Sequence, residues 1–317
     1  MNNKKLIVCL IIAAISLSLL HAANEDIGTK GFNFLRLFYS ARAGGMANAY
    51  TGQADDSDAL FFNPAGLPQL TKMMVSTSYI NYFEGFQGGS VVFAYPRRDR
   101  FAFGLYAQYL GNQGITRTLV DNLGEYLGTA GTFGATDLIV GASTGLYVHE
   151  MLNLGVGVKF IYQSIDDYSA SAVAVDLALF HQTMNDHVSV GVTLRNFGKQ
   201  LTYFTSSKYD EKMPTQLTVG FNYNPNEKLN ANLDIVKPFE QDFFGRLGAE
   251  YQVHPMLTLR AGFNSRADDW RMGGDFDFLS GLSAGFGCYL RQYEINYSIS
   301  SFGDLGLVNQ VSLKYTF

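Results

Sequence analysis

Apolar and polar residues alternate one by one along many segments of this chain. In the closing segment VNQVSLKYTF, residues 308–317, every second residue from Val311 onward is apolar and those between are polar. The segment 293–299 repeats the pattern, with Tyr, Ile, Tyr and Ile separated by Glu, Asn and Ser. A strand sends successive side chains to opposite faces, whereas a helix would scatter these residues around its axis. The pattern therefore predicts strands with one apolar and one polar face.

Fourteen segments are predicted to be such strands: 72–83, 87–96, 101–110, 136–148, 152–164, 170–181, 186–196, 214–223, 228–236, 244–252, 256–264, 278–289, 291–300 and 308–317. Most are close to the roughly 9–11 residues that a tilted strand needs to cross the hydrocarbon core of a bilayer. Short connections such as 182–185 alternate with long ones such as 111–135 and 197–213, which are expected to be outer loops. The expected fold is all-β: an antiparallel transmembrane β-barrel of about 14 strands, with short turns and both barrel ends in the periplasm.

Composition favours a barrel over a soluble all-β sandwich, which also alternates. The sequence has 33 Gly, 25 Phe and 19 Tyr, and only 16% of its residues are charged. The mean hydropathy is nevertheless close to zero, at +0.01, because apolar outer faces offset polar inner faces. A sandwich usually has shorter strands and rarely presents so many aromatic residues outward, so it is the minor alternative.

The first 22 residues have the order of a secretory signal peptide. Lys4 and Lys5 precede an apolar run broken by two serines, 6–20, and Ala22 and Ala23 supply small residues for a cleavage zone. An uncleaved membrane anchor is the alternative, but the run is short for a span of about 20 apolar residues. The expected organisation is a signal peptide at 1–22, an N-terminal hatch or plug at 23–71 and the transmembrane β-barrel at 72–317. Export to the bacterial outer membrane follows from this order.

Residues 23–71 lack sustained alternation and are rich in Ala and Gly. Asp55, Asp56 and Asp58 precede the run ALFF at 59–62, which predicts a capped helical turn that Pro64 ends. A calcium site is the alternative for the three acids, but the glycine and distal glutamate of a calcium loop are missing. The segment is therefore predicted to be a partly helical plug in the barrel lumen.

Charged residues collect on the face of the strands opposite to the apolar one. A Lys or Arg placed toward lipid at the midplane costs about 2–4 kcal/mol, so this face is wet or its charges are paired. Two interpretations stay open: a structural network that fills the lumen, and a selective polar channel. The predicted lumen-facing charged residues are Lys159, Asp176, Arg195, Asp234, Arg246, Glu250, Arg260, Glu294 and Lys314.

Several short motifs are distinctive: ARAGGM at 41–46, ADD at 54–56, NPAGL at 63–67, RNFG at 195–198, LGAEY at 247–251 and FGDLG at 302–306. Together they resemble the PorV/PorQ family, which belongs to the FadL-type superfamily of outer-membrane barrels. The resemblance covers nearly the whole mature chain. It implies a fourteen-stranded barrel with an N-terminal hatch, whose hatch motif is Asn63, Pro64, Ala65 and Gly66.

The same resemblance implies two functional options. FadL-type members pass hydrophobic compounds across the outer membrane, whereas PorV-type members bind cargo and shuttle it in type IX protein secretion. The chain is thus expected to act in outer-membrane transport or as an accessory protein of secretion, and a FadL-like transporter with no secretion role is the alternative. The expected partners are outer-membrane lipid and either a secreted cargo protein or a hydrophobic small molecule. Resemblance to such barrels also implies that Tyr315 and Phe317 form the C-terminal signal for the barrel-assembly machinery.

Neither catalysis nor cofactor or metal binding is expected. The four histidines of the mature chain lie at or beside predicted short turns, away from any cluster with a nucleophile; they are His149, His181, His187 and His254. Cleavage of the signal peptide leaves Cys288 as the only cysteine, which excludes an intramolecular disulfide and a multi-cysteine metal site. The net charge of −5 gives no nucleic-acid footprint. The sequence predicts a barrel that is neither an enzyme nor a nucleic-acid-binding protein.

Overall fold

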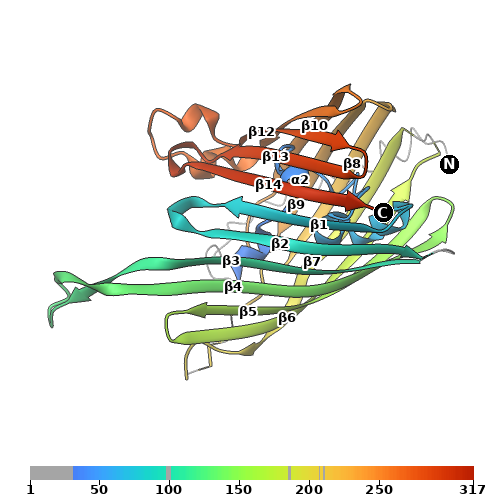
Figure 1. Cartoon of the computed structure of the whole chain (residues 1–317). Helices are drawn as coiled ribbons and strands as arrows, with labels where there is room; N and C mark the ends of the chain where they lie inside the picture. The colour runs from blue at the N-terminus through green and yellow to red at the C-terminus, as the bar shows by residue number, and fades with distance from the viewer. Residues whose placement is uncertain (1–30, 98–100, 185–186, 207, 210) are drawn as a thin grey trace.

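Fourteen antiparallel strands close into a barrel (Figure 1). The computed structural model describes residues 31–97, 101–184, 187–206, 208–209 and 211–317, so the predicted signal peptide at 1–22 lies outside the described residues. In chain order the strands are β1 (Met74–Asn81), β2 (Gln87–Arg97), β3 (Phe101–Val120), β4 (Tyr126–His149), β5 (Leu152–Ile165), β6 (Tyr168–Gln182), β7 (Val188–Thr202), β8 (Gln216–Asn226), β9 (Leu229–Pro238), β10 (Phe244–His254), β11 (Leu257–Asn264), β12 (Leu282–Leu290), β13 (Tyr293–Ser301) and β14 (Leu307–Thr316).

The alternation along each strand separates outward-facing from lumen-facing side chains. In β14, Val311 and Leu313 are exposed on the outside, whereas Ser312 and Lys314 are buried on the inner face. β14 also pairs with β1 over eight residues of each strand, so the barrel closes without a free edge. The predicted fold class, an antiparallel barrel of about 14 strands preceded by a partly helical segment, is confirmed.

Three of the predicted strand and loop boundaries are wrong. Residues 111–135 form a hairpin instead of a loop, because β3 and β4 stay paired from Asn112↔Ala135 to Val120↔Tyr126, with bulges. β12 starts later than the predicted residue 278, because the 3-10 helix η5 (Asp277–Leu279) turns the chain first. β7 continues past the predicted residue 196 to Thr202, because it stays paired with β6 beyond a bulge, so the first part of the predicted loop 197–213 is strand. These differences lie toward the ends of the strands, where the contrast between lipid and lumen no longer imposes an alternating pattern.

The two ends of the barrel differ in the length of their connections. One end, here the short-turn end, carries tight turns and the C-terminus (Figure 1). The opposite long-loop end carries the β3–β4 hairpin and the helices η3 (Phe83–Gly85), η4 (Ser265–Trp270), η5 and η6 (Gly303–Leu305). In transmembrane barrels of this kind, short turns face the periplasm and long loops face outward.

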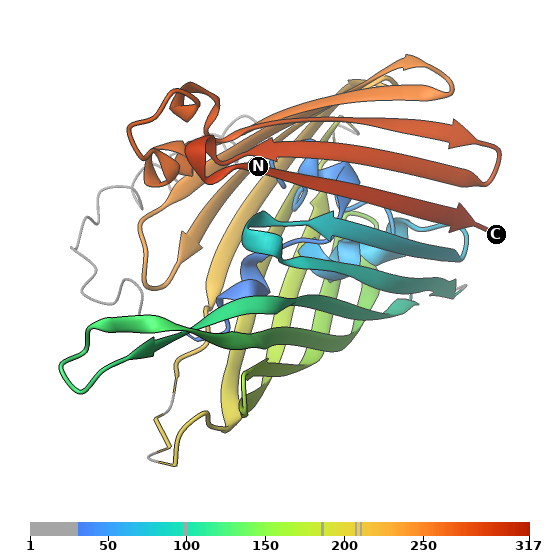
Figure 2. The same ribbon diagram turned by 60° about the vertical axis from the view of Figure 1, so that its left-hand side comes forward.

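Residues 31–71, called the hatch below, lie within the barrel (Figure 2). The hatch contains four short helices: η1 (Asn33–Arg36), α2 (Ala41–Gly44), α3 (Ala59–Phe62) and η2 (Pro64–Gln69). α2 packs against β12–β14, and η2 packs against β4–β6. The main apolar core forms where hatch side chains such as Leu60 and Phe62 meet the inner wall. None of the described helices is long and apolar enough to cross a membrane.

Candidate functional site

Arg42, in α2 of the hatch, is the centre of a buried charge cluster. Its guanidinium donates to Glu250 of β10, with Nη2–Oε1 at 2.6 Å and Nε–Oε2 at 3.2 Å. Through Nη1 it also donates to Asp55 and Asp56, each at 2.8 Å. Arg260 of β11 donates to the same Glu250 carboxylate, with Nε–Oε2 at 3.0 Å. Charge-assisted hydrogen bonds, which are stronger than neutral ones, therefore tie the hatch to this wall.

Lys314 of β14 extends the cluster toward the start of α3. Its ammonium pairs with Asp56, and with Asp58 at 2.8 Å, while Ser40 donates to the Asp58 carboxylate. Asp58 occupies the N-cap position of α3, but its side chain makes no capping hydrogen bond. The predicted capping role is wrong for Asp55 and Asp58, whose carboxylates pair with Arg42 and Lys314. It holds in part for Asp56, whose Oδ1 accepts from the Asp58 backbone N–H at 2.7 Å just before α3.

The two carboxyls beside Lys314 have opposite pKa shifts. Burial by itself raises the pKa of Asp56, but the charges of Lys314 and Arg42 outweigh burial and hold the pKa well below its usual range. For Asp58, burial raises the pKa and Lys314 offsets that rise only in part. Asp56 is therefore the carboxylate that the two cations keep ionised.

A second charge cluster lies on β5–β7. Lys159 donates through Nζ to the side-chain oxygens of Asp176 and Asn196, both at 2.7 Å. Asn196 has a φ of 59° beside a register shift between β6 and β7, and its backbone N–H donates to Asp176 at 2.7 Å. The bulge thus supplies the backbone donor that helps to satisfy a buried carboxylate.

Three further predicted residues contact the middle of the hatch. Asp234 accepts from the Thr51 hydroxyl at 2.7 Å and from the Thr51 backbone N–H at 3.2 Å. The guanidinium carbons of Arg195 and Arg246 lie 4.5 and 5.3 Å from the centre of the Phe38 ring. Within the described part of the chain, neither arginine makes a hydrogen bond or an ion pair. Their closest contacts are with aromatic rings, and Asp234 attracts both over a longer distance.

The remaining predicted lumen residue, Glu294 of β13, lies 3.8 Å from Arg260. The side chains of the nine predicted lumen-facing residues are thus brought to the inner wall, eight of them buried and Glu294 slightly more exposed. They do not form one site. They form the Arg42 cluster, the Lys159 cluster and the contacts around Asp234 and Phe38.

Asn63, the first residue of the predicted hatch motif, is fully buried and uses its whole side chain. Its Oδ1 accepts from the Ala65 N–H at 3.1 Å. Its Nδ2 donates to the carbonyls of Thr51, at 2.9 Å, and of Leu179 in β6, at 3.2 Å. Asn63 therefore caps η2 and joins two parts of the hatch to the wall.

The rest of the motif lies close to β5. Pro64 takes the first position of η2, where a missing N–H is no loss. A Cβ added at Gly155 of β5 would lie 2.3 Å from the Ala65 nitrogen, so only glycine allows this approach. Gly66 is equally constrained, because its Cβ would lie 2.2 Å from the Ala54 carbonyl oxygen.

Tyr315 and Phe317 lie on the outside at the short-turn end. The Tyr315 ring contacts those of Tyr293 and Phe317, with centroids 4.9 and 4.7 Å apart. The Phe317 N–H donates to the Met73 carbonyl at 3.0 Å, so the last residue is fixed beside the start of β1. This is the rim at which aromatic girdles occur in membrane barrels.

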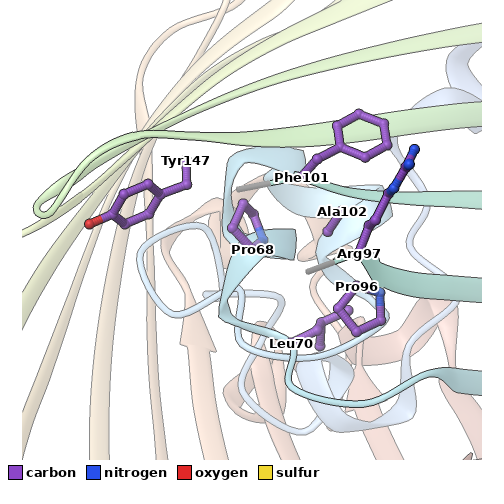
Figure 3. Close-up of a pocket in the computed structure, with 7 residues that line it drawn as sticks. All are labelled: Pro68, Leu70, Pro96, Arg97, Phe101, Ala102 and Tyr147. Carbon is purple, nitrogen blue, oxygen red and sulfur yellow. The ribbon is translucent and has the colours of Figure 1, made fainter. Parts of the chain in front are cut away.

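Cavities border the hatch at both ends. At the long-loop end, a cavity of about 330 Å³, here the vestibule, is lined by Phe38, Arg246 and other side chains of the hatch and inner wall. At the short-turn end, a second cavity of about 330 Å³ lies between the hatch and β2–β4 (Figure 3). Its lining residues are Pro68, Leu70, Pro96, Arg97, Phe101, Ala102 and Tyr147.

Between these cavities the lumen is nearly closed. A space of about 10 Å³, room for about one water molecule, lies between Leu35, Leu37 and Phe61 of the hatch and a wall that includes Lys159, Asp176 and Arg195. Tyr106 of β3 closes it from the wall, with its ring edge-on to Phe61 at a centroid distance of 5.3 Å. The side chains of Leu35, Leu37, Phe61 and Tyr106 are called the constriction below.

The sequence did not single out Arg42, Phe38 or the constriction. Arg42 could have been found, because a lone arginine in an Ala- and Gly-rich segment bound for the lumen must meet a carboxylate there. The constriction carried no such signal, since its members are ordinary apolar and aromatic residues. The described residues hold no group of three side chains suited to bind a metal ion.

No family model matches the chain, and no curated protein sequence matches it either. Solved structures do resemble it. The Ralstonia pickettii toluene transporter TbuX is 15% identical, with a TM-score of 0.60, and the match covers 90% of this chain and 100% of that one. The Pseudomonas putida toluene transporter TodX is 13% identical, with a TM-score of 0.61 and coverage of 88% and 97%. A Pseudomonas aeruginosa FadL homologue is 13% identical, with a TM-score of 0.55 and coverage of 89% and 99%.

At these identities the similarity concerns the fold. It extends over nearly the full length of each solved chain, so it includes the barrel and the segment inside it. The chain therefore has the FadL-type fold, a fourteen-stranded barrel around an N-terminal hatch.

Proposed function

We propose that the chain is an outer-membrane transporter that passes hydrophobic compounds through its barrel. One observation carries the proposal: two cavities of about 330 Å³ border the hatch at opposite ends, and between them lies a narrow space whose hatch side is apolar and whose wall side includes Tyr106 and the Lys159 cluster. A size of several hundred Å³ is typical of small-molecule sites. The similar structures described as toluene transporters support the same class of cargo.

The constriction is the gate of this proposed route. Phe61 belongs to α3 of the hatch, whereas Tyr106 belongs to the rigid wall. The Tyr106 ring lies over Gly141 of β4, where any Cβ would come within 2.3 Å of it. The wall side of the gate is therefore held in place, and movement of α3 opens it.

In this proposal the charged lumen residues are mainly structural. The Arg42 and Lys159 clusters satisfy their charges within the protein, through ion pairs between 2.6 and 3.0 Å. Buried pairs of this kind hold two parts together because breaking one leaves an uncompensated charge. The Arg42 cluster fixes the hatch to β10 and β11, whereas the Lys159 cluster joins β5, β6 and β7 within the wall. The proposed route runs between the apolar hatch side chains of the constriction and this wall. The signal peptide expected at 1–22 and the terminal Phe317 would direct export and assembly.

Uptake of toluene by cells that carry the full chain in their outer membrane tests the proposal. Cells with the protein should accumulate labelled toluene faster than cells with an empty vector. The variant Phe61→Ala should raise the rate further, because it widens the constriction. Leu105→Ala, next to Tyr106 but facing outward, is the matched control and should leave the rate unchanged. Equal accumulation with and without the protein, for toluene and for larger hydrocarbons, would contradict the proposal.

A second candidate function is docking of a protein partner at the long-loop end, as the resemblance to PorV-type proteins implies. The β3–β4 hairpin favours it, because the hairpin projects past the barrel (Figure 2) and carries apolar side chains at its tip. Leu123 at its tip is 87% exposed, and Tyr126 and Leu127 are also exposed. Apolar groups gathered in water commonly mark an interaction surface.

Replacing Leu123, Tyr126 and Leu127 by Ser separates the two functions. If the hairpin engages secreted cargo, surface display of proteins with C-terminal secretion signals should fall in the native cell. Toluene uptake should stay the same, since the hairpin tip is remote from the constriction. Unchanged display would count against a secretion role.

A further inference from the structure

We infer that the vestibule binds an aromatic carboxylate, with the carboxylate on Arg246 and Arg195 and the ring among the aromatic side chains. The inference rests on the proposed function in one respect: the vestibule is taken to be the entrance of the transport route. It goes beyond that function because a neutral hydrocarbon would need no cation there.

The vestibule has a strongly one-sided charge. Among the residues that the structure describes, three arginines line it, Arg36, Arg246 and Arg266, and no acidic side chain does. Arg36 and Arg266 have carboxylate partners elsewhere, in Glu240 and Asp269. Arg246 has no carboxylate within ion-pair distance among the described residues, although Asp234 lies opposite it on β9 and attracts it over a longer distance. The cavity thus presents a guanidinium whose Nε has no hydrogen-bond partner.

Arg246 and Arg195 are both buried, with 7% and 6% of their surface exposed. The Nε atom of each is buried and without a hydrogen-bond partner. A buried charge of this kind is costly unless an anion completes it. Both guanidiniums lie against the Phe38 ring, so one small anion that displaces Phe38 can reach the two together.

A third unpartnered donor supports a carboxylate. Gln216 of β8 also lines the vestibule, is almost fully buried and leaves its Nε2 amide without a partner. A carboxylate has two oxygens that accept from a guanidinium and an amide at once. An unpaired polar group at the bottom of a cavity is satisfied when a bound ligand forms a hydrogen bond with it.

The outer part of the vestibule suits an aromatic ring. Phe244, Trp270, Phe302 and Tyr82 line it, and the Trp270 and Phe302 rings are 4.5 Å apart. Aromatic pairs stabilise contacts beyond simple burial through edge-to-face and offset stacking. From the outside inward, the vestibule therefore presents first these aromatic rings and then the guanidinium groups. A ring that carries a short carboxylate, as in benzoate, has the same order.

Fluorescence of the purified full chain in detergent tests this directly, because Trp270 is the only tryptophan of the sequence and lines the vestibule. Benzoate should change the emission saturably and bind at least about tenfold more tightly than benzamide, its neutral counterpart, since bonds to charged groups are the stronger ones. Arg246→Gln and Arg195→Gln should each weaken benzoate about tenfold and leave benzamide unchanged. Arg117→Gln, on the projecting hairpin, is the matched control and should bind like the unchanged protein.

Arg246→Lys keeps the charge and should retain part of the affinity, which separates loss of charge from loss of folding. Equal affinity for benzoate and benzamide would overturn the inference. So would tighter binding of hexanoate than of benzoate, or full displacement of benzoate by equimolar inorganic phosphate. Toluene uptake distinguishes this inference from the proposed function. If the protein takes up toluene but does not prefer benzoate to benzamide, the transport function holds and the carboxylate site is wrong. If the protein binds benzoate but takes up no hydrocarbon, the carboxylate site holds and the transport function is wrong.

Discussion

Arg42 of the hatch and Glu250 of β10 are 208 positions apart in the sequence and face each other as a bidentate ion pair inside the barrel. The pair is buried, and Asp55 and Asp56 complete the coordination of the guanidinium. Charged side chains of a plug can be buried inside a barrel only if ion pairs of this kind replace their contacts with water. The hatch is therefore bound to one side of the barrel by charge and to the other side by apolar packing.

Replacing Glu250 by Ala should destabilise the folded barrel strongly. It removes the shared partner of Arg42 and Arg260, and loss of one member of a buried pair costs about 3–5 kcal/mol. The midpoint of urea unfolding, followed by gel mobility of the unheated protein, should fall. Glu227→Ala, in an exposed turn, is the control and should not move the midpoint. Equal midpoints for the two variants would show that the cluster does not hold the hatch.

Gly155→Ala should loosen the hatch motif from the wall. The added Cβ would meet the Ala65 nitrogen at 2.3 Å, and overpacking of this kind costs about 1–3 kcal/mol. Limited proteolysis should then cut the hatch earlier than in the unchanged protein. Gly245→Ala offers a close comparison, because its nearest neighbours are 4.0 Å away. If both variants resist proteolysis alike, the close approach of Ala65 to β5 is not needed for docking.

Asp56→Asn should destabilise the protein in a pH-dependent way. The cations Lys314 and Arg42 outweigh burial and depress the pKa of Asp56 in the folded chain. The ionised carboxylate therefore adds stability at neutral pH, and that stability is lost as pH falls below the ordinary pKa of about 3.9 toward the depressed one. The difference in unfolding free energy between the unchanged protein and Asp56→Asn should be largest near neutral pH and shrink in acid. A difference that grows as the pH falls would contradict the assignment.

Phe317→Ala should lower the amount of folded barrel in the outer membrane. The phenyl ring packs on Tyr315 at the short-turn rim and stays half exposed, available for recognition during assembly. The heat-modifiable fraction in isolated outer membranes measures this. Thr316→Ala changes the neighbouring residue and should have a smaller effect. If Phe317→Ala assembles as well as Thr316→Ala, the terminal ring is not the assembly signal.

Alternation predicted all fourteen strands because each barrel residue faces either lipid or lumen, and the two environments select opposite side chains. Beyond the rim this selection ends. Residues 112–120 and 126–135 pair with each other beyond the rim, where both faces tolerate Gly, Asn and Thr, so their sequence shows no alternation and predicts a loop.

The contacts of the hatch were harder to predict, because they join residues that are distant in the sequence. Asp58 precedes a helical turn, and local reasoning assigned it to capping. Its actual partners are Lys314, at the far end of the chain, and Ser40. Nothing in the neighbouring sequence singles out Phe38, because the two arginines that contact its ring belong to β7 and β10, far along the chain.

A reversible lock on the hatch tests the central claim, that cargo passes through the lumen by movement of α3. Ser57, just before α3, and Ser76 of β1 have their hydroxyl oxygens 3.4 Å apart, so their side chains meet and are a suitable pair for an engineered crosslink between the hatch and the wall. The double variant Ser57→Cys, Ser76→Cys, with Cys288→Ser to remove the other thiol, should lose most of its toluene uptake when oxidised and regain it after reduction. Oxidised protein that takes up toluene as fast as the reduced protein would contradict the claim.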